Sequence, residues 1–284
     1  MPRFAYVNGQ YVDHRDGAVH IEDRGFQFAD GVYEAWGIAD GKIVDFELHL
    51  DRLTRSLSEL RIDWPMGRKA LSMTMVKLVR RNRIKEGILY LQITRGVSPR
   101  DHAFPTTPVP SSIVLTAKAV SRSSYKNQAA KGINVITVPD ERWARPDIKS
   151  VSLLPNVLAI QKARDAGAWD SWLVDSDGFV TESTRTNAWI VDKDGNLITR
   201  KPTNAILNGI TRRVLVALME KEGRKIIERS FTVEEAKAAR EAFQSSASAW
   251  IMPVVEIDGQ PIGNGAPGSV ATGLRQAYLE HAAK

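Results

Sequence analysis

The sequence predicts an α+β fold in two domains. Short runs rich in β-branched and aromatic residues are bounded by Asn-Gly and Asp-Gly pairs, which is typical of β-hairpins. Amphipathic stretches with helical spacing stand between groups of such runs and do not alternate with them one by one. A polar segment at 121–131 is expected to link a small N-terminal domain, 1–120, to a larger C-terminal domain, 132–284. We therefore expect mixed or antiparallel sheets with flanking helices.

The N-terminal domain is expected to combine tight hairpins with two helices. Asn8-Gly9 and Asp40-Gly41 are suited to two-residue turns between strands. Four leucines then recur at the spacing of one helical face, which predicts an amphipathic helix: Leu50, Leu53, Leu57 and Leu60. A second helix is predicted over 68–82.

Two further strands and a long loop complete this domain. Residues 88–94 and 113–117 are rich in Ile, Leu, Val and Tyr and predict strands. The segment between them, 95–112, contains four prolines and predicts a loop. Loops of this length in a compact domain are often functional.

The C-terminal domain is expected to begin with a strand at 132–138. Helices are predicted over 155–166 and 209–222, and Thr232 with Glu235 has the spacing of a capping box at the start of another helix. Turns are expected at the Asp-Gly pairs within 176–178, 194–196 and 258–259.

Composition excludes several classes of function. The absence of cysteine excludes disulfides, cysteine-ligated metals and thiol catalysis, and we expect no metal site. No apolar run approaches the roughly 20 residues that span a bilayer, and the N-terminus lacks a signal peptide, so we expect a cytoplasmic protein without a membrane partner. The net charge of +6 is modest and dispersed. Its densest cluster, 80–83, is best explained as a solvated helix end and not as a nucleic-acid site.

Lys149 and three other groups match the needs of a pyridoxal phosphate (PLP) site. PLP is held on a lysine amine as a Schiff base, and Lys149, in the expected C-terminal domain, lies just before the predicted helix at 155–166. An acid beside the pyridine nitrogen keeps the ring protonated, and Glu182 can supply it. Arg52 and the start of the helix at 209–222 can bind the phosphate, because an arginine fork and helix N–H groups both suit an anion.

Each of these groups, taken alone, has an ordinary explanation. An isolated lysine or arginine is most often a solvated surface residue, and Glu182 alone would suit a solvent-facing strand. Ser246 and Ser248 offer hydroxyls for a phosphate, although a serine-rich run is more often a polar loop. The combination of an amine, an acid and anion-binding groups is what favours PLP.

The sequence also resembles the fold-type IV PLP enzymes and, among them, the D-amino acid aminotransferases. The resemblance runs along nearly the whole chain and is strongest at 22–34, 94–100, 147–150 and 209–212. It implies a two-domain fold-type IV enzyme that uses PLP. It also implies a homodimer with shared active sites.

The resemblance implies a role for each of eleven residues. Lys149 corresponds to the Schiff-base lysine and Glu182 to the partner of the pyridine nitrogen. The other cofactor-binding residues are Arg52, Leu207, Ile210, Thr211, Ser246 and Ser248. The carboxylate of the substrate corresponds to Tyr33, Arg100 and His102, of which the arginine and histidine are implied to reach the site of the partner subunit.

Two positions depart from the family pattern. Arg185 stands where the family usually has small residues, which puts the contacts on that side of the cofactor in doubt. Ala247 replaces a hydroxyl residue that some relatives have, so one phosphate contact is in doubt.

The implied activity is transfer of an amino group from a D-amino acid such as D-alanine to a 2-oxo acid such as 2-oxoglutarate, by a ping-pong route. An (R)-selective amine aminotransferase or a branched-chain aminotransferase of the same fold is the alternative within PLP chemistry. A non-enzymatic basic protein that binds anionic polymers is the alternative from another class.

Overall fold

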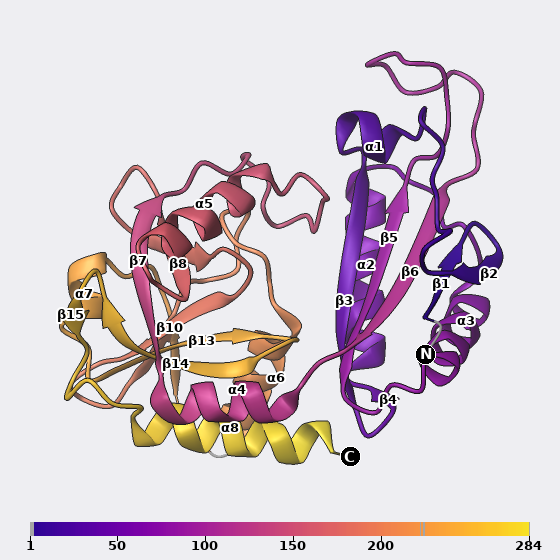
Figure 1. Cartoon of the computed structure of the whole chain (residues 1–284). Coiled ribbons are helices and arrows are strands. Elements are labelled where there is room, and N and C mark those ends of the chain that lie inside the picture. Colours follow the sequence, from indigo (N-terminus) through magenta and orange to yellow (C-terminus); the bar gives the residue numbers. More distant parts are fainter. Residues whose placement is uncertain (1–2, 222, 224, 284) are drawn as a thin grey trace. The chain divides into compact units, whose positions relative to one another are not determined.

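The computed structural model describes residues 3–221, 223 and 225–283, and the chain divides into two compact units (Figure 1). Unit 1 comprises the chain up to Ser121 together with Ile148–Ser152, and unit 2 comprises Arg122–Asp147 and the chain from Leu153 onward. Each unit contains its own sheet and its own helices. The predicted α+β class, with antiparallel and mixed sheets, is confirmed.

Unit 1 is built on a six-stranded antiparallel sheet in the order β2-β1-β6-β5-β3-β4. The strands are β1 (Phe4–Val7), β2 (Gln10–Asp13), β3 (Gly31–Ala39), β4 (Lys42–Ile43), β5 (Gly87–Thr94) and β6 (Ser112–Ala119). The helices are α1 (Arg24–Phe28), α2 (Phe46–Glu59) and α3 (Arg68–Arg81). The two predicted turns, the two predicted helices and the long loop between β5 and β6 are therefore confirmed.

Side chains of β3 point alternately to the two faces of the sheet, and this alternation determines which of them face the helices. Val32 and Trp36 lie in the apolar core of this unit with Leu53 of α2. Successive side chains of a strand point to opposite faces, so Glu34 shares the helix face and Tyr33 the other face. A buried carboxylate thus stands in an apolar core, and it needs partners there.

The segment that contains Lys149 is held along the edge of β3. The backbone N–H of Tyr33 donates to the carbonyl of Lys149 at 2.9 Å, and that of Val151 donates to Gly31 at 3.1 Å. This edge is open because β4 pairs only with the far end of β3. The expectation that the lysine belongs to the C-terminal domain therefore differs from the structure, which places residues Ile148–Ser152 in unit 1.

Of residues 121–131, expected to be a linker, all but Ser121 form a helix. This helix, α4 (Arg122–Lys131), belongs to unit 2, and Ala129 is its buried residue. Both α4 and the C-terminal helix α8 (Ser269–Ala282) pack against β14 (Figure 1). A single buried position gives almost no helical pattern, which is why the sequence suggests a polar linker.

Unit 2 is built on a nine-stranded mixed sheet. Eight strands follow the order β12-β11-β10-β13-β14-β7-β8-β9, and β15 pairs with β14. The strands are β7 (Ile133–Pro139), β8 (Asp170–Val174), β9 (Val180–Ser183), β10 (Asn187–Val191), β11 (Leu197–Thr199), β12 (Ile226–Glu228), β13 (Glu241–Ser246), β14 (Trp250–Ile257) and β15 (Gln260–Pro261). The remaining helices are α5 (Leu154–Asp165), α6 (Ile210–Lys221) and α7 (Val233–Lys237).

Local signals in the sequence hold well in this unit. The capping box of α7 is present, with the Thr232 hydroxyl accepting from the Glu235 N–H at 3.1 Å and the Glu235 carboxylate accepting from the Thr232 N–H at 3.0 Å. The helix predicted at 209–222 is α6, although residue 222 lies outside the described residues. Helices α1 and α8 are not among the helices that the sequence predicts.

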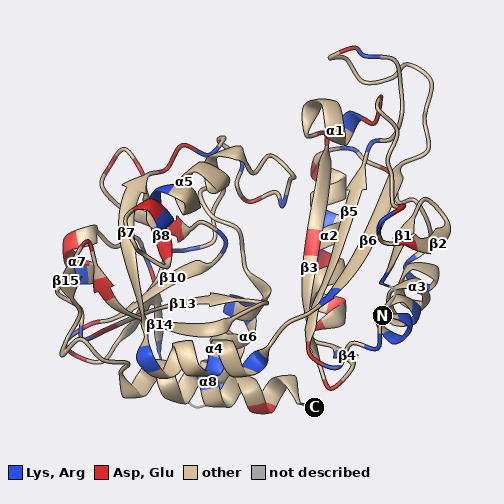
Figure 2. Ribbon diagram, viewed as in Figure 1, with Lys and Arg blue, Asp and Glu red and all other residues tan. Residues whose placement is uncertain are grey.

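Charged residues are interspersed over both units (Figure 2). At the end of α3, Arg81 lies over the rings of Phe4 and Tyr11, with its guanidinium carbon 4.5 Å from the centre of the latter. Part of the densest basic cluster is therefore used in packing within unit 1. In the part of the chain that the structure describes, no helix is long and apolar enough to cross a membrane.

Candidate active site

Lys149 lies over an aromatic ring. Its Nζ atom is 4.1 Å from the centre of the Tyr33 ring, and its backbone N–H donates to the Ser56 hydroxyl at 3.4 Å. The side chain is half-buried. Backbone bonds to β3 and contact with a fixed ring hold the amine at one face of the unit 1 sheet.

Tyr33 belongs to a small aromatic and polar group on that face. Its ring stacks on Tyr90 of β5, with 5.7 Å between the ring centres, and the Tyr90 hydroxyl donates to Gln92 at 2.9 Å. Burial, with a smaller contribution from Tyr33, raises the pKa of Tyr90 to about 12. The Tyr90 phenol therefore stays protonated at neutral pH and keeps this bond to Gln92.

Arg52 is paired with the buried carboxylate of β3. Its Nε and Nη2 atoms donate to Glu34 at 2.6 and 2.9 Å, and Nδ1 of His49 lies 2.8 Å from the same carboxylate. Burial alone would raise the pKa of Glu34, but the charge of Arg52 and the bonds from both neighbours lower it well below its usual range. Burial lowers the pKa of His49, so a neutral ring donates from Nδ1.

Arg100 and His102, in the long loop of unit 1, both lie against the ring of Phe28 at the end of α1. The Arg100 guanidinium is 4.7 Å from the centre of the Phe28 ring, and the His102 ring is 5.3 Å from it. Buried Arg24 lies under the same loop and donates to the carbonyls of Asp101 at 2.6 Å and His102 at 3.3 Å. The two exposed side chains therefore project from an anchored backbone.

Asp30 secures this anchor. It accepts from Arg24 Nε at 2.9 Å and from Arg95 Nε at 2.7 Å. Although burial opposes it, the two guanidinium groups lower the pKa of Asp30. Arg95 also donates to the carbonyls of Leu60 and Arg61, both at 2.8 Å, which ties the start of the loop to the end of α2.

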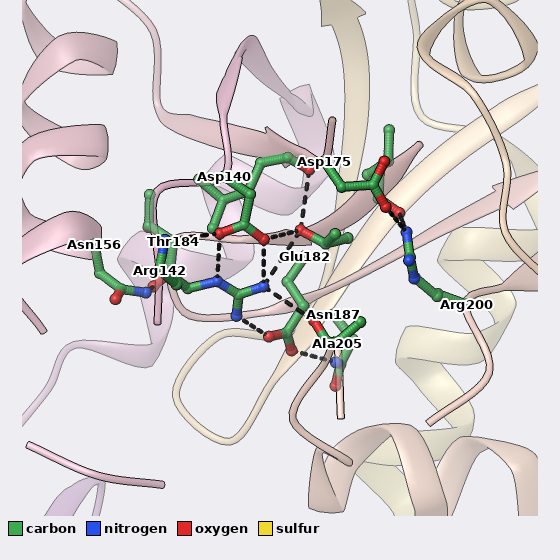
Figure 3. Close-up of polar contacts among 12 residues, drawn as sticks. Asp140, Arg142, Asn156, Asp175, Glu182, Thr184, Asn187, Arg200 and Ala205 are labelled. Atoms are coloured by element: carbon green, nitrogen blue, oxygen red, sulfur yellow. Dashed lines mark hydrogen bonds and ion pairs between the residues drawn. The ribbon is translucent and has the colours of Figure 1, made fainter. Parts of the chain in front are cut away.

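In unit 2, Glu182 of β9 is buried and accepts from Arg142 Nη1 and from Asn187 Nδ2, the latter at 2.8 Å (Figure 3). Arg142 also donates to both oxygens of Asp140, at 2.9 and 2.7 Å. Although burial opposes it, the charge of Glu182 and the bonds that Arg142 donates to Asp140 raise the pKa of Arg142. A permanent cation therefore lies against the Glu182 carboxylate.

Asn187 connects Glu182 to the start of α6. Besides Glu182, its side-chain amide donates to the Leu207 carbonyl at 2.9 Å. A Cβ atom at Gly209 would lie 2.1 Å from Asn187 Oδ1, so only glycine fits this approach. Ile210 and Thr211 form the buried first turn of α6, where N–H groups have no acceptor within the helix and suit an anion.

Ser246 is the last residue of β13, and Ser248 lies in the turn that leads to β14. Their hydroxyl oxygens are 3.3 Å apart, and Ser246 also accepts from the Ala249 N–H at 3.2 Å. Two hydroxyls thus converge at one point of unit 2, with Ala247 between them.

The structure brings the sequence-predicted residues together in groups. In unit 1, Lys149 meets Tyr33. Within the described residues, Arg100 and His102 both contact the Phe28 ring, whereas the Tyr33 ring contacts Lys149. Arg52 joins Glu34, which points to the sheet face opposite to Tyr33. In unit 2, Asn187 links Glu182 to the residues that precede α6.

Sequence reasoning missed Arg142, Asn187 and the anchor formed by Asp30 with Arg24. Arg142 stands in a charged stretch with Asp140 and Arg145, and no local pattern selects it. Asp30 and Arg24 fall inside the family-like stretch at 22–34, which is the one signal that pointed to them.

Comparison with known proteins agrees with this fold. Residues 31–257 match the family Amino-transferase class IV. The chain is 39% identical to the D-alanine aminotransferase of Bacillus licheniformis over 98% of both chains. It is 41% identical to that of Listeria monocytogenes over 96% of this chain and 94% of the relative. The solved branched-chain amino acid aminotransferase of Escherichia coli has the same fold, with a TM-score of 0.92 and 23% identity over 99% of this chain and 94% of that one.

The chain therefore belongs to the class IV aminotransferase family. It is an aminotransferase, as its full-length similarity to curated members of that family requires.

Proposed function

We propose that the protein transfers the amino group of a D-amino acid to a 2-oxo acid and uses PLP as its cofactor. The observation that carries the proposal is near-complete coverage at 39–41% identity by relatives named D-alanine aminotransferase. The branched-chain alternative rests on solved structures at 23–25% identity, which share the fold. Arg100 and His102 on their anchored loop supply donors for a carboxylate, which a pure amine substrate lacks.

The residues present fit PLP. Gly209 approaches Asn187 closely, and Asn187 in turn binds the Glu182 carboxylate, so the start of α6 is linked to a fixed acid. Lys149 supplies an amine from a segment that is hydrogen-bonded to the edge of β3. When bound, PLP supplies an aldehyde carbon that takes up an amine and a pyridine ring that withdraws electrons. We assign to Lys149 Nζ the attachment of the cofactor and the transfer of the substrate α-proton.

Glu182 is proposed to hold the proton on the pyridine nitrogen. Arg142 and Asn187 fix both of its oxygens, and the adjacent guanidinium favours the ionised carboxylate. The N–H groups of Ile210 and Thr211 are proposed to bind the phosphate with the hydroxyls of Ser246 and Ser248. Arg52, in the orientation that Glu34 maintains, is proposed as its cationic partner, and Leu207 is proposed to pack on the ring.

Tyr33, Arg100 and His102 are proposed to hold the α-carboxylate. We also propose a homodimer, in which Arg100 and His102 serve the site of the partner subunit. The apolar side chains of Ile21, just before α1, and of Phe26, within α1, are 75% and 72% exposed and are suited to burial against another subunit.

Visible absorbance of the purified protein tests the function. We expect a PLP band that D-alanine bleaches and a 2-oxo acid restores, with a much weaker response to L-leucine or an (R)-aryl amine. A colourless protein with salt-sensitive binding to DNA would instead favour the non-enzymatic alternative.

Mixed dimers test the shared site. Lys149→Ala and Arg100→Ala proteins are each expected to be impaired, and refolding them together is expected to restore part of the D-alanine activity. Such a dimer contains one site with Lys149 from one subunit and Arg100 from the other. No recovery in a verified mixed dimer would place both residues in the same subunit's site.

A further inference from the structure

The turn between β9 and β10 is fixed by a buried carboxylate. Asp170, at the start of β8, has no exposed surface, and it accepts from Ser183 at 3.0 Å and from Thr184 at 2.6 Å. Gln244 of β13 donates to it at 3.0 Å. Within the turn, the Ser183 N–H donates to the Thr186 carbonyl at 2.9 Å. Two side-chain bonds to Asp170 and one backbone bond across the turn therefore hold it in one conformation, and Gln244 fixes Asp170 in turn.

Arg185 projects from the apex of this fixed turn. Residues 180–184 and 186–191 are buried, whereas Arg185 is exposed. The carbonyl before it, that of Thr184, accepts from Asn156 of α5 at 2.7 Å (Figure 3). Within the described part of the chain, the Arg185 guanidinium makes no hydrogen bond and no ion pair, while its backbone N–H lies 3.5 Å from the Ser183 hydroxyl.

The residues on either side of this turn belong to the candidate site. Glu182 precedes it and Asn187 follows it, and the two are joined by a hydrogen bond of 2.8 Å. Arg185 is three residues from the proposed acid of the cofactor site. An uncommitted guanidinium on a rigid turn is well suited to a carboxylate, which its fork can bind through two parallel bonds.

We propose that Arg185 binds the side-chain carboxylate of a dicarboxylic substrate, of the class of 2-oxoglutarate and D-glutamate. The inference rests on the proposed function. Tyr33, Arg100 and His102 account for the α-carboxylate, so a substrate with a second carboxylate needs a second cation. The exposed guanidinium of Arg185 can supply it, which makes Arg185 a determinant of substrate choice in this chain.

The test compares substrates with one and two carboxylates on the holoenzyme. Arg185→Ser is expected to lower kcat/KM for D-glutamate and 2-oxoglutarate by about ten- to a hundred-fold, as for the loss of a charge-assisted hydrogen bond. D-alanine and pyruvate are expected to change by less than about two-fold. Arg185→Lys keeps the charge without the fork and is expected to fall between the two. Calorimetric binding of glutarate is expected to weaken while that of butyrate does not.

Arg240→Ser is the matched control. Arg240 is an exposed arginine beside the far end of β10, where its N–H donates to Val191, so the substitution makes the same change of charge away from the turn. It is expected to leave all four substrates unaffected. An equal loss for D-alanine and D-glutamate in Arg185→Ser, or no loss for either, would overturn the inference. Failure of the unmodified enzyme with D-alanine would overturn the proposed function instead.

Discussion

Lys149 illustrates how a single residue obtains its place from neighbours distant in sequence. Its carbonyl accepts from Tyr33 and its amine lies over the Tyr33 ring, although the two residues are more than a hundred positions apart. We expect borohydride reduction of the holoenzyme, followed by peptide mapping, to attach the cofactor to Lys149. A label on another lysine would sink the assignment. Lys149→Ala is expected to lose turnover by several orders of magnitude and to keep part of its affinity for PLP.

Glu182 is expected to act through its charge. Glu182→Gln keeps nearly the same volume but removes the carboxylate that faces Arg142, so the pyridine nitrogen of the cofactor should lose its proton more readily. Turnover is expected to fall far more than affinity for PLP, which separate measurements of kcat and of PLP binding will show. An unchanged kcat would mean that another acid fills this role.

Arg100 is expected to discriminate substrates by their carboxylate. Loss of a charge-assisted hydrogen bond costs roughly 1.5–3 kcal/mol, so Arg100→Ala should lower kcat/KM for D-alanine by about ten- to a hundred-fold or more. An amine donor without a carboxylate should lose much less. If both donors suffer equally, Arg100 has a structural role, and the assignment returns to the class IV family without a preference for D-amino acids.

At the level of single elements, the start of α6 depends on Gly209. Gly209→Ala would bring a methyl group within 2.1 Å of Asn187 Oδ1, so Asn187 must move and its bonds to Glu182 and Leu207 must weaken. We expect a loss of PLP affinity of about ten-fold or more, measured by equilibrium dialysis, since a charge-assisted hydrogen bond is at stake.

Gly273→Ala provides the control for that substitution. Gly273 lies inside α8, and a Cβ atom there would meet nothing within 4 Å. Alanine is favoured over glycine in a helix by about 0.8–1.0 kcal/mol, so thermal stability should rise slightly while PLP binding stays the same. Equal PLP affinity in the two variants would show that the space around Gly209 is unimportant.

For the whole molecule, buried ion pairs set the response to acid. The pKa values of Glu34, Asp30 and Asp140 are lowered in the folded state. A carboxyl group whose folded pKa is depressed contributes stability above its unfolded pKa, and this stability is lost as pH falls through the folded pKa. Burial lowers the pKa of His49, which acts in the same direction below its ordinary value of about 6.5.

We therefore expect the melting temperature to decline gently between about pH 6.5 and 4.5 and steeply below about pH 4, where unfolded carboxylates take up protons. Thermal unfolding of the apoenzyme across this range measures the effect. In Asp30→Asn, which is expected to be less stable at neutral pH, the difference from the parent protein should shrink as the pH falls. A difference independent of pH would show that Asp30 contributes by packing alone.

Many secondary-structure elements of this protein could be predicted from its sequence, because the patterns that define them are local. Leucine spacing along α2, the capping box of Thr232 and Glu235, and the Asn-Gly turn at residue 8 each depend on a few neighbouring residues, and each is present as expected. Residue types and motif order likewise predict the kinds of chemical group in the candidate site, namely an amine, an acid and anion-binding groups.

Other features required the folded chain. Residues 148–152 join unit 1 because one edge of β3 is open there, and α4 replaces an expected linker because β14 offers it a surface. Arg142 contacts Glu182 although the two are forty positions apart in the sequence. Asp170 accepts a hydrogen bond from Thr184 and so fixes the turn that contains Arg185. Burial selects such pairings, because a charge that is removed from water must have a partner among the side chains packed around it. No local sequence pattern identifies that partner.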